Sequence, residues 1–347
     1  SIYAGIQGKG IVGQEDCLYL DIKAPVNNLN RRLPVMFWIH GGGNTSGIKD
    51  YYDFSELIRR HQVLVVTINY RLGPLGWFTH PAIQGLQNGL DKSSNFGTLD
   101  IIEALKWVKK NIQNFGGDPN NITIFGESAG GHNVLSLLAS PLAEGLFHKA
   151  IIQSGSMRTE SAAHAENFSD DKVDGYFSSS NELIAQLFQD LGIASNRKEA
   201  KRDIQSIDDE NLAAILRSQK ASQIVFADLN NRFVRAKIHQ IPQLIRDGIV
   251  LPMKSIPSLL AHPTDYNNVP IILGSNRDDA KSHMAFEKEN VYQFAKIFPR
   301  IRDHIDYSRQ ALLRSAQTHA LAVEKPAELF TKSRLDVDAP MNVFTYR

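Results

Sequence analysis

The sequence predicts an α/β protein built on a doubly wound, mostly parallel sheet. Residues 33–40 and 63–70 are continuous apolar runs, which are typical of strands buried on both faces. Each run is followed by a loop that contains glycine, and helix-like segments alternate with the strands farther along the chain. This βαβα alternation predicts a sheet covered by helices on both faces.

The first half of the chain gives the clearest order of elements. We expect, in turn, a helix at 54–61, a helix at 98–115, a strand at 122–125, a helix from the next turn to residue 139, and a strand at 149–153. The long helix rests on the helical spacing of Ile101, Leu105 and Val108. The Gly-Gly-Asp-Pro sequence at 116–119 is a helix stop signal.

The pattern changes after residue 156. Residues 157–248 are more polar, with amphipathic helices expected at 181–191 and 209–218. We interpret this segment as a helical cap inserted into one domain that comprises residues 1–347. It is not interpreted as a second domain.

Three further elements are expected after the cap. Residues 269–273 return to the sheet, 286–324 are helical by composition, and 343–347 are β-branched and aromatic, as in a strand. Because a complete domain rarely stops in the middle of a strand, we expect the domain to be truncated at both ends.

Composition excludes several classes of protein. Lys and Arg number 38 and Asp and Glu 37, so a net charge of +1 argues against a strongly electrostatic nucleic-acid binder. No apolar run is long enough to predict a membrane-spanning helix. Cys17 is the single cysteine, which excludes a disulfide framework within this chain and a zinc site built from several cysteines.

The strongest chemical signal is the Gly-Glu-Ser-Ala-Gly sequence at 126–130, between a predicted strand and a predicted helix. It matches the nucleophile elbow, a strained turn that presents a serine at the carboxyl edge of the sheet. The helix that begins there points its first N–H groups toward the reacting oxygen. The alternative is a glycine-rich helix start in which Ser128 is only an N-cap, but the strand–turn–helix context favours a nucleophile.

A second glycine motif, His-Gly-Gly-Gly at 40–43, follows the first apolar run. Acyl transfer develops negative charge on a carbonyl oxygen, and glycine lets main-chain N–H groups approach that oxygen closely. Such a motif forms the second half of the oxyanion hole in lipases and esterases. A flexible loop after a strand is the alternative; the chain order of the two motifs favours the oxyanion hole.

Five motifs together resemble the type B carboxylesterase/cholinesterase family of α/β-hydrolases. They begin at residues 15, 38, 69, 115 and 125 and read EDCLYL, WIHGGG, NYRLGP, FGGDP and FGESAGG. The resemblance is dense over 11–155 and returns at 247–280. It implies an α/β-hydrolase fold and ester hydrolysis through an acyl-enzyme, without cofactor or metal. It also implies that Ser128 is the nucleophile and that the N–H groups of Gly42, Gly43 and Ala129 form the oxyanion hole.

The acid of a catalytic triad should follow a later core strand. The resemblance implies a loop of the form G-x-N-x-D-E, and residues 274–279 read Gly-Ser-Asn-Arg-Asp-Asp. Asp279 therefore stands where the family usually has glutamate. We expect Asp279 to face Ser128; Asp278 is the alternative acid, and a solvated loop carboxylate is the remaining possibility.

No histidine of this chain fits the role of catalytic base. His283 follows Asp279 too closely to come from a separate loop, and His304 and His319 lie in helix-like stretches. In the family the histidine follows a strand that resembles residues 343–347. We therefore expect the histidine base beyond Arg347.

Three further features gain meaning from the resemblance. Glu127 resembles a buried carboxylate that orders active-site water, although a plain ion-pair role is equally open. Arg71 and Asp100 are expected to form a buried ion pair, and an acidic residue also suits the first turn of a helix. Cys17 resembles a cysteine that pairs with one upstream; a free buried thiol is the alternative. Pairing would imply a secreted or periplasmic protein, and its absence a cytoplasmic one.

These observations predict a serine hydrolase that cleaves carboxylic esters through an acyl-enzyme. Its partner would be a small-molecule ester, with no nucleic acid and no membrane span. The alternative function is a catalytically silent cholinesterase-like protein used for adhesion or binding. Such relatives typically lose the serine, so the presence of Ser128 favours the enzyme.

Overall fold

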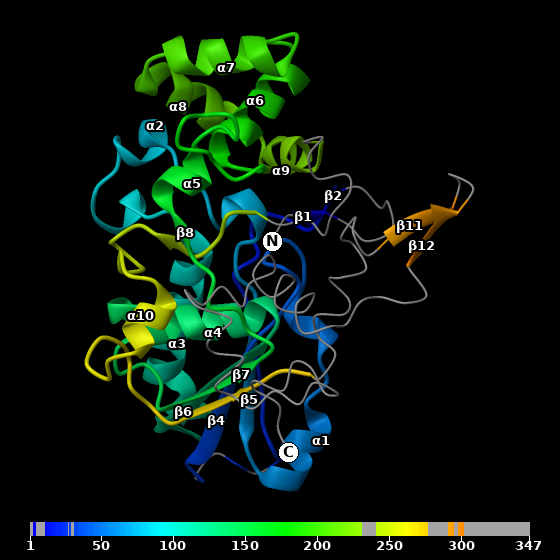
Figure 1. The fold of residues 1–347 in the computed structure, drawn as a ribbon. Helices are drawn as coiled ribbons and strands as arrows, with labels where there is room; N and C mark the ends of the chain where they lie inside the picture. Colours follow the sequence, from blue (N-terminus) through cyan, green and yellow to red (C-terminus); the bar gives the residue numbers. More distant parts are fainter. Residues whose placement is uncertain are drawn as a thin grey trace.

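The computed structural model describes residues 3–4, 11–26, 28, 31–230, 241–276, 291–294 and 298–301. Its centre is a six-stranded sheet with the strand order β10-β7-β6-β4-β5-β3 (Figure 1). The strands are β3 (Leu20–Lys23), β4 (Leu33–Ile39), β5 (Leu64–Ile68), β6 (Gly117–Glu127), β7 (Lys149–Gln153) and β10 (Ile271–Gly274). Only β3 runs antiparallel to its neighbour in this sheet. The predicted parallel sheet is confirmed.

Helices cover both faces of the sheet (Figure 1). On one side lie α3 (Phe96–Asn111), α4 (Ala129–Ala139) and α10 (Ile256–Leu260); α1 (Ser55–His61) lies on the other. Side chains alternate along β4: Phe37 joins the main core with α3 and α4, whereas Trp38 packs in a smaller core with Ile58 of α1. Burial on both faces explains why these strands read as unbroken apolar runs.

The segment predicted as a cap is helical. It contains α5 (Ala162–Glu166), α6 (Ser180–Asp190), α7 (Arg197–Ser206), α8 (Asp209–Ser218) and α9 (Ala221–Asn230). Phe168, Phe188 and Leu212 belong to a second core of this region, and α6, α7 and α8 stand together at the top of the view in Figure 1. None of the described helices is both long and apolar enough to cross a bilayer.

The remaining elements are short. They are β1 (Tyr3–Ala4), β2 (Ile11–Val12), α2 (Pro81–Gln84), β8 (Glu160–Ser161), β9 (Ile245–Arg246), β11 (Val291–Phe294) and β12 (Phe298–Ile301). Single 3-10 turns lie at Lys49–Tyr51, Gly73–Leu75, Gly89–Lys92, Ile112–Phe115 and Pro141–Ala143.

One expectation differs from the structure. The helix predicted over 286–324 is wrong where the chain is described, because β11 and β12 pair there as antiparallel strands. Both segments carry β-branched or aromatic residues, which suit strands. Helices α2, α5, α7, α9 and α10 were not among the predicted elements. The sequence of α7, RKEAKRDIQS, offers only two apolar positions, Ala200 and Ile204, and both are buried. The strand predicted at 343–347 lies outside the described residues.

Candidate active site

Ser128 occupies a strained turn between β6 and α4. Its backbone has φ 55° and ψ −122°, a conformation that residues other than glycine rarely adopt. The Ser128 N–H donates to the carbonyl oxygen of Gln153 at 2.9 Å, and the Ser128 carbonyl accepts from the His132 N–H at 3.0 Å. The chain therefore holds this residue from both sides, and the strand–turn–helix context of the elbow motif is confirmed.

The glycines around Ser128 are required by close backbone contacts. A Cβ added to Gly126 would lie 2.5 Å from the carbonyl carbon and oxygen of Gly130. A Cβ added to Gly130 would lie 2.1 Å from the carbonyl oxygen of Ile39, at the end of β4. The two glycines of the G-x-S-x-G pattern are therefore needed because the elbow packs too closely on the neighbouring strand to leave room for a Cβ.

The glycine loop after β4 lies against the elbow. A Cβ built on Gly41 would lie 3.3 Å from the Cβ of Ser128 and 2.8 Å from the carbonyl oxygen of Glu127. Gly42 and Gly43 have φ of 108° and 66°, so the chain turns there in the left-handed region. These contacts bring the two predicted halves of the oxyanion hole to the same place.

Gly42 and Gly43 on one side and Ala129 on the other each have a feature that suits an oxyanion donor. Gly42 is exposed and Gly43 is partly exposed, so both can be reached by a ligand. Ala129 is the first residue of α4, where helix geometry leaves the N–H without an intrahelical acceptor. Ser128 is itself partly exposed. The structure therefore places Ser128, Gly42, Gly43 and Ala129 at one end of the sheet.

His40 lies beneath the glycine loop. Its ring is buried, stacks on Tyr70 with 4.4 Å between ring centroids, and has Nδ1 2.8 Å from the Gly41 carbonyl oxygen. Burial lowers the pKa of His40 to about 4, so the imidazole is neutral at neutral pH. These contacts make His40 a support of the loop, and its burial separates it from a base that must reach substrate.

Glu127 ends β6 and faces the same loop. Its Oε2 would lie 3.2 Å from a Cβ on Gly41, and the side chain is partly buried. Burial and then the charge of Glu127 raise the pKa of Tyr52. The carboxylate thus lies beside the loop and close to Tyr52. Its predicted roles, ordering water or forming an ion pair, both stay predictions.

The strand that precedes the predicted acid lies next to β7. Gly274 pairs with Gln153 across this parallel contact, and its carbonyl oxygen accepts from the Ser154 N–H at 2.7 Å. The loop after Gly274 therefore leaves the sheet at the edge that holds Ser128. Asp278, Asp279, His283, His304 and His319 lie outside the described residues. The acid and the base of the triad stay predictions.

Two smaller expectations can be compared with the structure. Arg71 and Asp100 are in contact, with Nη2 2.6 Å from Oδ1; the Asp100 side chain is 5% exposed and that of Arg71 37%. The predicted ion pair is confirmed, although only the carboxylate is buried. Cys17 is a buried free thiol in this structure.

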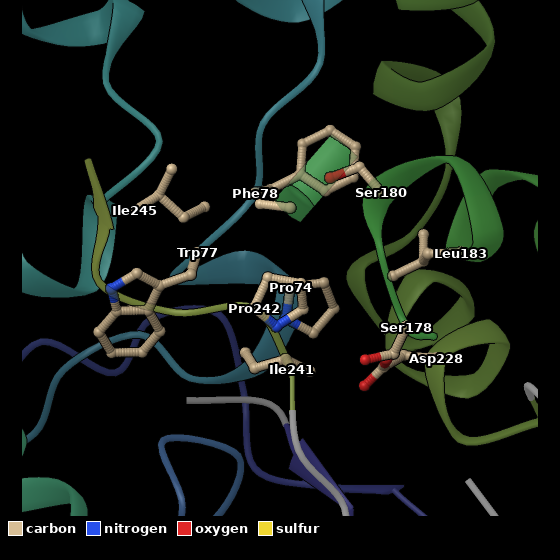
Figure 2. A pocket seen from close by; sticks show the side chains of 11 residues that line it. Pro74, Trp77, Phe78, Ser178, Ser180, Leu183, Asp228, Ile241, Pro242 and Ile245 are labelled. Carbon is tan, nitrogen blue, oxygen red and sulfur yellow. The ribbon is translucent and has the colours of Figure 1, made fainter. Parts of the chain in front are cut away.

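A separate cavity lies between the core and the cap helices (Figure 2). Its wall is mostly apolar, including Trp77, Leu183 and Ile245, and the buried carboxylate of Asp228 adds a polar group. Neither Ser128 nor the glycine loop lines it. Within the described ranges, no group of three His, Cys, Asp or Glu side chains is placed to hold a metal ion.

A serine on a strained elbow, facing a glycine loop at the edge of a mostly parallel sheet, defines the α/β-hydrolase class. The chain belongs to the carboxylesterase family, whose model matches residues 3–335.

Similar proteins agree with this assignment. The chain is 37% identical over 266 residues to "cocaine esterase" of Oryctolagus cuniculus, covering 76% of this chain and 42% of that protein. It is 49% identical over 157 residues to "para-nitrobenzyl esterase" of Bacillus subtilis (strain 168), covering 45% of this chain and 31% of that protein. A solved structure of a PNB esterase is 30% identical, with a TM-score of 0.62, over 95% of this chain and 60% of that one. The chain thus spans less than half the length of these two curated relatives.

Sequence reasoning missed a polar cluster under the glycine loop. It consists of Asn44, Tyr70, Asn133 and Gln243, whose side chains are joined by hydrogen bonds. The residues come from four separate parts of the chain, so no local pattern marks them. The one available signal was the presence of two amides beside the two glycine motifs.

Proposed function

We propose that this protein is a serine esterase that cleaves small carboxylic esters through an acyl-enzyme intermediate. The observation that carries the proposal is the contact between Ser128 and the glycine loop, with only 3.3 Å between the Ser128 Cβ and a Cβ built on Gly41. An ester carbonyl at Ser128 would lie beside main-chain N–H groups on both sides. This arrangement serves acyl transfer, in which a carbonyl oxygen becomes an oxyanion.

The reaction has two halves. In the first, the Ser128 hydroxyl oxygen attacks the ester carbonyl while a histidine base takes the hydroxyl proton. The N–H groups of Gly42, Gly43 and Ala129 stabilise the oxyanion. The tetrahedral intermediate then collapses, and the alcohol leaves with the proton that the histidine returns. In the second half, water attacks the acyl-enzyme by the same route and releases the carboxylic acid.

The remaining triad members are part of this proposal. Asp279 would orient the histidine and stabilise it when protonated. Its position after β10 supports this role, because β10 and β7 are paired and the elbow follows β6 next to them. The two relatives described above are named as esterases, which supports the reaction class.

Ester turnover by the natural full-length protein tests the proposal. We expect hydrolysis of p-nitrophenyl acetate and butyrate, and we expect Ser128→Ala to lower kcat by roughly a thousandfold or more. Ser140→Ala is a matched control, because this hydroxyl lies at the end of the same helix and donates to Val250 O at 2.7 Å. Comparable turnover by wild type and Ser128→Ala would reject the proposal. Absence of turnover in the wild type would favour the silent binding protein.

A further inference from the structure

We propose that Asn44 and Asn133 form a positioning pair that fixes the glycine loop relative to the nucleophile helix. The inference rests on the proposed esterase function and assigns these residues a role in its rate. Asn44 directly follows the three glycines, and Asn133 lies in α4, the helix that begins after Ser128. The pair therefore links the two structural pieces that carry the oxyanion donors.

The link is a direct hydrogen bond. The Asn133 Nδ2 donates to the Asn44 Oδ1 at 2.9 Å, and both residues have 0% exposed surface. The Asn44 Nδ2 in turn donates to the Gln243 side-chain oxygen. The Asn44 side chain thus accepts a hydrogen bond from α4 and donates one to the segment that follows the cap.

Tyr70 and Gly73 hold the same loop. The Tyr70 hydroxyl lies 2.6 Å from the His40 carbonyl oxygen, before the glycines, and 3.3 Å from the Asn44 Oδ1, after them. The Gly73 N–H donates to the Asn44 carbonyl oxygen at 2.7 Å. The loop is therefore fixed at both ends, and Asn133 adds a side-chain hydrogen bond from the nucleophile helix.

Residue type fits this task at both positions. Asn44 has φ 57°, a left-handed conformation that asparagine tolerates better than most residues. In the structure the Asn133 Nδ2, and not its oxygen, faces the Asn44 Oδ1. Among the described residues the Asn133 Oδ1 has no hydrogen-bond partner, an arrangement that costs stability. The Asn133 amide thus acts only as a donor toward the glycine loop, which suits a positioning role.

The expected consequence concerns the transition state. The N–H groups of Gly42 and Gly43 must keep their distance from that of Ala129 to meet one oxyanion. Removing an oxyanion donor costs about 10²–10³ in kcat, and a shift of a donor by a fraction of its bond length costs less. We therefore expect loss of the pair to lower kcat about 10- to 100-fold, with KM changed by less than about twofold.

A double-mutant cycle in the natural full-length protein tests the pair. Asn133→Ala removes the donor and favours the helix, and Asn44→Gly removes the acceptor while keeping the left-handed turn accessible. We would measure kcat and KM on p-nitrophenyl butyrate, inhibition by a trifluoromethyl ketone that forms a tetrahedral adduct with the serine, and Tm. Ser140→Ala controls for loss of a buried hydrogen bond at the C-terminal cap of α4.

If the pair positions the loop, we expect three results together. Each single variant loses kcat and trifluoromethyl ketone affinity in parallel, the double variant is no worse than the poorer single variant, and Ser140→Ala lowers Tm without lowering kcat. If Asn133→Ala fails to fold, Asn44→Gly with Ser140→Ala still decides between positioning and stability. Unchanged kcat, a rise in KM alone, multiplicative losses, or an equal loss in Ser140→Ala would overturn it. A wild type without ester turnover and without ketone inhibition would instead reject the esterase function itself.

Discussion

The Arg71 guanidinium donates two hydrogen bonds to the Asp100 carboxylate, from Nε to Oδ2 at 2.8 Å and from Nη2 to Oδ1 at 2.6 Å. The Arg71 main-chain N–H adds a third bond to Oδ2 at 3.0 Å. Arg71 follows β5, and Asp100 is the fifth residue of α3, just past the first turn in which the sequence placed it. The contact therefore joins the long helix to the end of a core strand. The carboxylate is the buried member of the pair.

Asp100→Ala should lower the free energy of unfolding by about 2–3 kcal/mol, because three hydrogen bonds are lost and a charged guanidinium is left without its partner. The partial exposure of Arg71 keeps this figure below the cost of breaking a fully buried pair. Urea unfolding measures it. Glu103→Gln, in an exposed pair with Lys106 on the same helix, is the control and should cost less than about 0.5 kcal/mol. Equal effects of the two substitutions would contradict the interpretation.

Gly41→Ala should lower kcat strongly, by about a hundredfold, because the new methyl group would press on the Glu127 carbonyl oxygen and displace the loop from Ser128. Gly145→Ala is the matched control. Gly145 has φ 70° with no atom within 4 Å of an added Cβ. Alanine at this position therefore causes backbone strain but no steric clash. We expect the control to lose stability but keep its kcat. Wild-type kcat in Gly41→Ala, measured on p-nitrophenyl butyrate, would be inconsistent with a loop packed on the elbow.

The buried His40 predicts a specific dependence of stability on pH. Its pKa is lowered to about 4, below the ordinary value near 6.5, so the unfolded chain binds more protons between these two values. Its contribution is therefore complete above pH 6.5 and declines as pH falls from 6.5 toward 4, by about 3 kcal/mol in all. Equilibrium unfolding at pH 7, 5.5 and 4.5 measures the slope.

His40→Asn should flatten that slope without removing it. His132, whose pKa burial also lowers to about 4, contributes a dependence of the same sign. The variant isolates the share of His40, because the other titratable groups stay in place. Identical pH slopes for wild type and His40→Asn would show that His40 is not kept neutral by the fold.

Local sequence was sufficient where close backbone packing dictates the residue. Gly126 and Gly130 contact Ile39 or each other at distances no side chain allows, so the elbow could be recognised from its spacing. Strands β4 and β5 could be predicted because both of their faces are largely buried. In such cases the residues that determine the local structure lie within a short stretch of sequence.

The sequence was insufficient where the cause is a contact between distant residues. Asn44 and Asn133 lie 89 positions apart, and the sequence around either residue does not predict the hydrogen bond between them. Strand β3 is only four residues long, and its pairing with β5 defines it more than its own composition. Strands β11 and β12 were missed because surrounding helix-forming residues dominated the composition of that stretch.

The central claim is that Ser128 is a covalent nucleophile, and the most direct measurement is the site of labelling by a fluorophosphonate probe. The natural full-length protein would be treated with the probe, digested, and the modified peptide identified by mass spectrometry. We expect one phosphonyl group on Ser128 and none in Ser128→Ala, with Ser140→Ala labelled like the wild type. Labelling of a different serine, or undiminished labelling of Ser128→Ala, would contradict the account.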